Sequence, residues 1–127
     1  MEAEQLVMFE DVDKSLVRSE VINALIEYRA LKVQNENIQE RIEVGATNLY
    51  PSIREVDPLN KIKVSQMERS LKHSLNEDER SLLERKYLSG VRVKDIEVYN
   101  DLGLDKDKYY EIKRSAIFNL ATALGII

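Results

Sequence analysis

The residues best suited to chemistry lie in one short stretch near the C-terminus, from Asp105 to Arg114. It starts with a residue type that caps helices and continues with long polar side chains. Arginine and lysine donate hydrogen bonds to guanine, and a carboxylate accepts one from the cytosine amino group. This chemistry is typical of base reading in duplex DNA. The side chains that we expect near a duplex are Lys106, Asp107, Lys108, Tyr110, Glu111 and Arg114, with Arg92 and Lys94 beside them.

The sequence offers little material for an enzyme, a metal site or a cofactor site. It contains no cysteine and a single histidine, His73, which excludes thiol catalysis and leaves few ligands for zinc. No nucleophile has a recognisable base, and no glycine-rich phosphate loop occurs. We therefore expect no catalytic residues, no metal, no cofactor and no enzymatic activity.

Three consecutive helices are predicted to position the polar stretch. They cover residues 76–88, 93–101 and 105–124, and the glycines at 90 and 103 interrupt them. Gly103 can adopt the left-handed backbone conformation that a tight turn requires. Two short helices followed by a tight turn and a longer helix form a helix-turn-helix, which lays its last helix in the major groove.

Helix starts and helix faces can also be predicted in this region. Asn76 and Glu79 have the spacing of a capping box, and Asp105 is the expected cap of the last helix. In the helix of residues 93–101 we expect Ile96, Tyr99 and Leu102 to share a side. The helical period of the last helix puts these residues on its core side: Tyr109, Ile112, Ala116, Ile117, Leu120 and Leu124. It points these outward: Asp107, Tyr110, Glu111, Arg114 and Phe118, the last as a docking point for the N-terminal helix or a second subunit.

A long helix is predicted between about residues 13 and 42. Its apolar positions follow a heptad pattern, with Asn35 at a core position. The pattern is compatible with a homodimer through this helix, in which Glu27 faces Lys32 of the second copy, or with a helix that folds back on its own domain. The heptad positions are Val17, Val21, Ala24, Tyr28, Leu31, Asn35, Ile38 and Ile42.

The rest of the chain suggests its division into parts. Residues 45–60 contain both prolines and no sustained period, so we interpret them as a connector. A further helix follows up to about residue 74, with Ile62, Met67 and Leu71 on one side. We therefore expect an N-terminal part at 1–44, a connector at 45–60 and a helix-turn-helix domain at 61–127. All the elements predicted in this chain are helices, so we expect the all-α class. No signal peptide or membrane span is recognisable, which favours a soluble cytoplasmic protein.

The formal charge of −4 looks at first like an objection to binding DNA. By segment the net charge is −5 for residues 1–44, +2 for 45–75 and −1 for 76–127, so the acidity lies mainly in the N-terminal part. Around the expected DNA face the cations are Arg92, Lys94, Lys106, Lys108, Lys113 and Arg114. We expect modest affinity, or help from dimerisation or a partner.

Several motifs of residues 75–126 together resemble a known family. They are LNEDERSLLERKY at 75–87, DI at 95–96, LGL at 102–104, YYEIKR at 109–114 and ALGI at 123–126. This combination resembles the ArpU family of phage and prophage transcriptional regulators, and it is similar to the promoter-reading fourth region of bacterial sigma factors. The resemblance implies a helical bundle that binds double-stranded DNA near promoters of late phage genes or autolysin-type genes. It also implies that Lys106, Asp107, Lys108, Tyr110 and Glu111 lie near the bases, with Arg114 near phosphate or bases.

Two other classes of function remain open at this point. The three-helix unit could be a protein-docking module that binds RNA polymerase or another regulator without reading DNA, which the acidic balance and an outward Phe118 favour. The chain could also be a structural coiled-coil protein with a helical tail. Competition with unrelated duplex separates the first from a DNA reader, and truncation near Leu75 tests the second.

Overall fold

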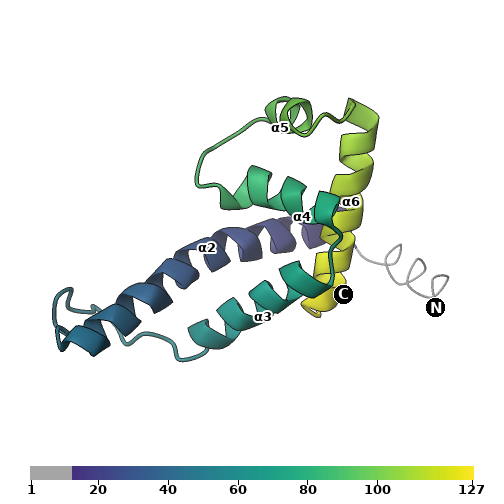
Figure 1. Ribbon diagram of the computed structural model, residues 1–127. Coiled ribbons are helices and arrows are strands. Elements are labelled where there is room, and N and C mark those ends of the chain that lie inside the picture. The colour runs from purple at the N-terminus through teal and green to yellow at the C-terminus, as the bar shows by residue number, and fades with distance from the viewer. Residues whose placement is uncertain (1–12) are drawn as a thin grey trace.

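The computed structural model describes residues 13–127, and these form an all-helical bundle without strands (Figure 1). The helices are α2 (Lys14–Val44), α3 (Asn60–His73), α4 (Glu77–Leu83), α5 (Asp95–Asp101) and α6 (Lys106–Ala123). A π-helical turn, Glu84–Leu88, continues α4 directly. The predicted all-α class is confirmed. No described helix is both long enough and apolar enough to cross a bilayer.

The bundle is built around α2 and α6. Helix α2 lies along α3 and also contacts the π-helical turn and α6, while α4 packs closely on α6. Helix α5 contacts α6 and the π-helical turn, at the end of the molecule away from α3 (Figure 1). The largest fully buried core side chains come from four of the helices: Val21, Leu25, Leu82, Leu83, Val98, Tyr109 and Leu120.

The first half of α2 packs inside its own chain. The side chains of Val17, Val21, Leu25 and Tyr28 are buried there, mostly at steps of four. Leu25 was absent from the heptad prediction, which placed Ala24 at the centre instead. A straight helix drifts away from a strict heptad repeat, so the buried face follows the 3.6-residue period.

The charges on α2 form ion pairs with α3. Lys63 binds Glu27 at 3.1 Å, and Lys32 approaches Glu68 at 3.5 Å. These contacts match the helix that folds back on its own domain, one of the two alternatives for this region. Farther along α2, Asn35 and Ile38 are half-buried and Ile42 is exposed.

Side chains close the corner between α3 and α4. The Asn76 carboxamide accepts a hydrogen bond from the Glu79 amide at 2.8 Å, and Glu79 accepts one from the Asn76 amide at 2.9 Å, as the capping box predicted. The Arg80 guanidinium donates to the carbonyls of Leu71 and Lys72 and so satisfies the end of α3. On α3 the predicted apolar face was wrong at one position, because Ile62 is exposed and Val64 is buried in its place.

Candidate nucleic-acid interface

The turn between α5 and α6 has the geometry of a helix-turn-helix. Gly103 is left-handed with φ of 70°, and the Leu104 amide donates to the Tyr99 carbonyl at 2.8 Å. Asp105 then caps α6, because its carboxylate accepts a hydrogen bond from the Lys108 amide at 2.8 Å. The chain therefore bends at Gly103, and α6 starts as a separate helix.

The inner face of α5 differs from the predicted one. Ile96 was expected on the buried side but is 51% exposed, and Val98 is almost completely buried instead. Tyr99 and Leu102 pack against the core as expected. With only the seven residues Asp95–Asp101, α5 is too short for its apolar spacing to define one face.

The Asp95 carboxylate, at the first residue of α5, connects three elements. Its Oδ1 accepts a hydrogen bond from the Tyr109 hydroxyl at 2.5 Å and one from the Lys113 ammonium at 3.0 Å. Its Oδ2 accepts from the Tyr110 hydroxyl at 3.3 Å. Lys86 of the π-helical turn lies 3.7 Å from Oδ1. These contacts fix the position of α5 relative to the start of α6.

Lys113 lies inside a group of aromatic rings. Its ammonium is 5.7 Å from the ring centre of Tyr87 and 5.8 Å from those of Tyr109 and Tyr110, within cation–π range. The Lys113 side chain is 12% exposed. The prediction that Lys113 belongs to the cations around the expected DNA face is therefore wrong, since its ammonium packs between α5 and α6.

The pKa values in this cluster reflect competition between burial and pairing. Burial alone would raise the pKa of Asp95, but the hydrogen bonds from Tyr109 and Lys113 outweigh it and lower that pKa. Burial alone would lower the pKa of Lys113, yet the contact with Asp95 holds it above its usual value. Burial and then the hydrogen bond to Asp95 raise the pKa of Tyr109.

The lowered pKa of Asp95 predicts how stability depends on pH. A carboxyl with a lower pKa in the folded than in the unfolded state stabilises the fold at neutral pH, and this contribution is lost below about pH 4. The raised pKa of Lys113 keeps its charge through the same range. We expect the difference in unfolding free energy between wild type and Asp95→Asn, measured with urea, to be constant near neutrality and to shrink on acidification. A difference that persists unchanged to about pH 2 would contradict this.

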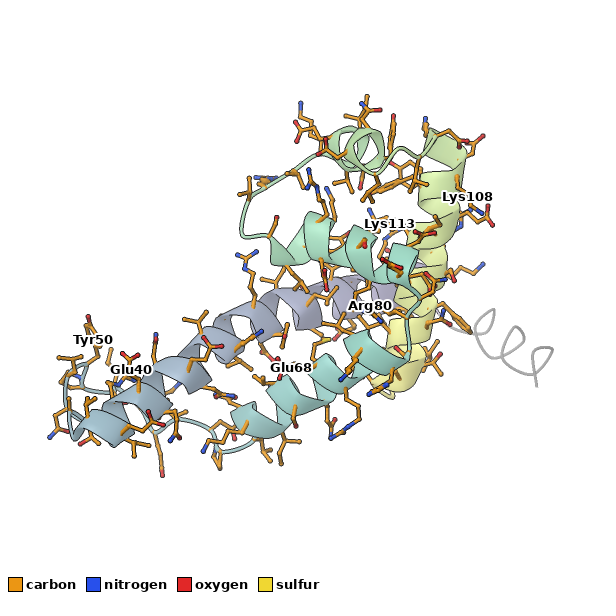
Figure 2. All side chains as sticks on the ribbon, in the orientation of Figure 1. Glu40, Tyr50, Glu68, Arg80, Lys108 and Lys113 are labelled. Atoms are coloured by element: carbon orange, nitrogen blue, oxygen red, sulfur yellow. The ribbon has the colours of Figure 1, made fainter. Side chains whose placement is uncertain are left out.

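The structure leaves most of the predicted contact residues accessible. Lys106, Asp107, Lys108, Glu111 and Arg114 are exposed on α6, and so are Arg92 and Lys94 in the segment before α5. Figure 2 shows Lys108 on the outer side of α6 and Lys113 on the side toward the rest of the bundle. Lys108 lies 3.7 Å from Glu111. Within residues 13–127 no ion pair involves the other four cations, Arg92, Lys94, Lys106 and Arg114.

Two residues on the predicted outward face are less free than expected. Tyr110 is half-buried, and its hydroxyl is held by Asp95. Phe118 is half-buried as well. At 100° per residue Tyr110 borders the core face, and a large ring there can turn inward to meet the part-buried carboxylate of Asp95.

A second structural cluster escaped the sequence analysis altogether. The Oε2 atom of Glu79 accepts a hydrogen bond from the Ser115 hydroxyl at 2.6 Å and one from the Asn119 amide at 3.0 Å, both on α6. The capping-box pattern identified Glu79, but it predicted only the contact with Asn76. Nothing in the local sequence indicates which distant helix the second oxygen meets.

The described residues contain no group of histidine, cysteine, aspartate or glutamate that could hold a metal ion. Helix α6 presents a polar, partly cationic surface over its first turns. The contacts of Asp95 hold the start of this helix in place against α5.

No family model, curated protein or solved structure matches the chain.

Proposed function

We propose that this chain is a sequence-specific double-stranded DNA-binding regulator of transcription, and that the start of α6 enters the major groove. The observation that carries the proposal is the accessible surface from Lys106 to Arg114 after the left-handed turn at Gly103. This surface lies at the end of the molecule formed by α5 and the start of α6, away from α3 (Figure 1). A duplex could therefore approach it without displacing a helix.

The contacts fall into two groups in this proposal. Arg92, Lys94 and Lys106, which carry no ion pair in residues 13–127, contact phosphates and supply affinity. Arg114 and Glu111 reach base edges and supply most of the discrimination. Tyr110 contributes through its ring at most, because its hydroxyl already binds Asp95.

The target genes follow from the family resemblance of residues 75–126. The ArpU-like and sigma-like motifs support promoters of late phage genes or autolysin-type genes as targets, with RNA polymerase as a further partner. In the structure, several motif residues have roles in the bundle: Arg80 closes the end of α3, and Asp95 and Tyr109 join α5 to α6. Part of the resemblance therefore lies in residues that hold α6 in position, and part in residues of α6 that would contact DNA.

A protein-docking module is the second candidate. The ion pair between Lys108 and Glu111 reduces the positive charge of the surface, and Ile96 offers an exposed apolar side chain on α5. A module of this kind would bind RNA polymerase or another regulator without reading DNA. It would therefore show no preference among duplex sequences.

Substitutions on α6 test DNA reading. We expect Arg114→Ala to weaken binding to a selected duplex by about 1 to 3 kcal/mol, with a smaller loss on unrelated duplex, because a base contact is removed. Lys106→Ala should weaken both and lower the slope of log affinity against log salt by about 1. Fluorescence anisotropy over a salt series measures these effects.

The matched control is Lys72→Ala, which removes an exposed cation of α3, the helix at the other end of the molecule from α5 (Figure 1). It should leave affinity and salt slope unchanged. Equal effects of Lys72→Ala and Lys106→Ala would mean that only general electrostatics is at work, and would count against the proposed surface.

A further inference from the structure

The end of the molecule opposite the proposed DNA surface is unusually rich in exposed apolar side chains. It consists of residues 38–62, the end of α2, the connector and the start of α3, here called the tip. Figure 2 shows Glu40 and Tyr50 at the tip, far from Lys108. Of the fourteen exposed large apolar side chains in residues 13–127, eight lie here. They are Ile42, Val44, Leu49, Tyr50, Ile53, Val56, Leu59 and Ile62.

The tip also contains a groove. It has a volume of about 380 Å³ and lies between the end of α2 and the connector. Its apolar lining includes Ile38, Ile42, Val56 and Pro58, and Tyr50 lies on the same groove under the Arg41 guanidinium, 5.7 Å from ring centre to carbon. Next to it in the connector, Ile53 is fully exposed. A groove with a partly apolar, partly polar lining and a projecting apolar side chain thus occur side by side on one surface.

We propose that the tip is a homodimer interface, in which Ile53 of each copy inserts into the groove of the other. A two-fold interface needs a surface that is complementary to itself, and a projecting side chain beside a groove meets this requirement. Side chains that fill well-packed, desolvated pockets near the centre of a contact carry much of the binding energy.

The charges of the tip favour a second copy over a charged partner. Four carboxylates, those of Glu40, Glu43, Glu55 and Asp57, stand against the three cations Arg41, Arg54 and Lys61. This near balance provides no strong field to select an acidic or a basic partner. Between two copies it lets acidic and basic groups face each other with little net repulsion.

The interface lies on a different part of α2 from the heptad pattern that first suggested a dimer. The first half of that pattern is buried in the chain's own core at Val17, Val21 and Tyr28. The second half, at Ile38 and Ile42, lines the groove. The inference does not rest on the proposed function, because the tip could join two copies whether or not α6 reads DNA.

Sedimentation equilibrium of the full chain without DNA tests the inference. We expect a mass of twice 14.7 kDa at about 100 μM, and a dissociation constant at least about tenfold higher for Ile53→Asp and for Ile42→Asp. The matched control is Leu16→Asp, at the other end of α2, since Leu16 is 57% and Ile42 54% exposed. It should leave the dimer intact. Thermal melts by circular dichroism verify that each variant is folded.

Crosslinking then locates the contact. The chain has no cysteine, so mixing Ile53→Cys with Val56→Cys protein allows a disulfide only between copies. We expect this mixture to form a disulfide between the two variants under mild oxidation, and the mixture of Ile53→Cys with Leu16→Cys to form none between its two variants. A monomeric wild type, an assembly larger than a dimer, or a dimer insensitive to Ile53→Asp would overturn the inference. None of these results bears on the Arg114→Ala test of DNA binding.

Discussion

Replacing Asp95 with alanine is expected to lower the free energy of unfolding by about 2 to 3 kcal/mol, at or just below the range for breaking a fully buried ion pair, because the Asp95 side chain is part-buried. The substitution leaves the ammonium of Lys113 surrounded by tyrosine rings, with its closest carboxylate gone. It also removes the acceptor of the Tyr109 hydroxyl, which is buried with its ring. Urea unfolding followed by circular dichroism at pH 7 measures the loss. Because Asp95 also holds α5 against α6, the proposed binding to DNA should weaken even where the variant is still folded.

A double-mutant comparison shows whether the unpaired Lys113 causes this loss. Methionine in place of Lys113 keeps an unbranched apolar chain among the rings without a charge. The variant Asp95→Ala with Lys113→Met should therefore be more stable than Asp95→Ala alone. Asp101→Ala is the control for removing a carboxylate from α5, since Asp101 forms an exposed pair with Arg85 and should matter by no more than about 1 kcal/mol. Equal losses for Asp95→Ala and Asp101→Ala would contradict the role given to the cluster.

Glu79→Ala is expected to be the other strongly destabilising substitution, by about 2 to 3 kcal/mol. Its carboxylate is buried and accepts hydrogen bonds from the Asn76 amide, the Ser115 hydroxyl and the Asn119 amide. Alanine removes the acceptor that these three donors share and with it the contact that joins the start of α4 to α6. The loss should appear as a lower midpoint of urea unfolding with an unchanged slope.

Glutamine at position 79 separates shape from charge. Glu79→Gln has one side-chain oxygen and one NH2 group. If the oxygen accepts from the Asn76 amide, the NH2 group faces Ser115 and Asn119 on α6; if the oxygen faces α6, it is a weaker acceptor than the carboxylate and the contact with Asn76 is lost. We expect a loss of about half that of alanine, and Ser115→Ala should cost about 1 kcal/mol. If Glu79→Gln were as stable as wild type while Glu79→Ala was not, lost packing rather than the charged hydrogen bonds would be the cause.

The features that could be predicted from the sequence are those determined by residues close together in the chain. Asn76 and Asp105 cap helices through amides three residues away, and Gly103 supplies a backbone conformation that other residues avoid. The core side of α6 also follows from one long period, with Tyr109 and Leu120 fully buried on it. These local signals are enough to place the helix-turn-helix and the accessible residues at the start of α6.

The features that could not be predicted depend on contacts across the bundle. Asp95 has the same local signature as other acids at helix starts, and only the packing of α5 on α6 brings it to Tyr109 and Lys113. The π-helical turn Glu84–Leu88 has no sequence signal, yet it carries Tyr87, whose ring packs on the Lys113 ammonium. For the same reason Lys113 could not be distinguished in sequence from the exposed cations near it.

Selection from a random duplex pool tests most directly whether the surface from Lys106 to Arg114 reads duplex sequence, as we propose. The wild-type chain should enrich one consensus, and Arg114→Ala, verified as folded, should lose discrimination at one base pair of it while keeping the rest. Enrichment of no sequence by the wild-type chain, at low as well as moderate salt, would contradict the claim and favour the docking module.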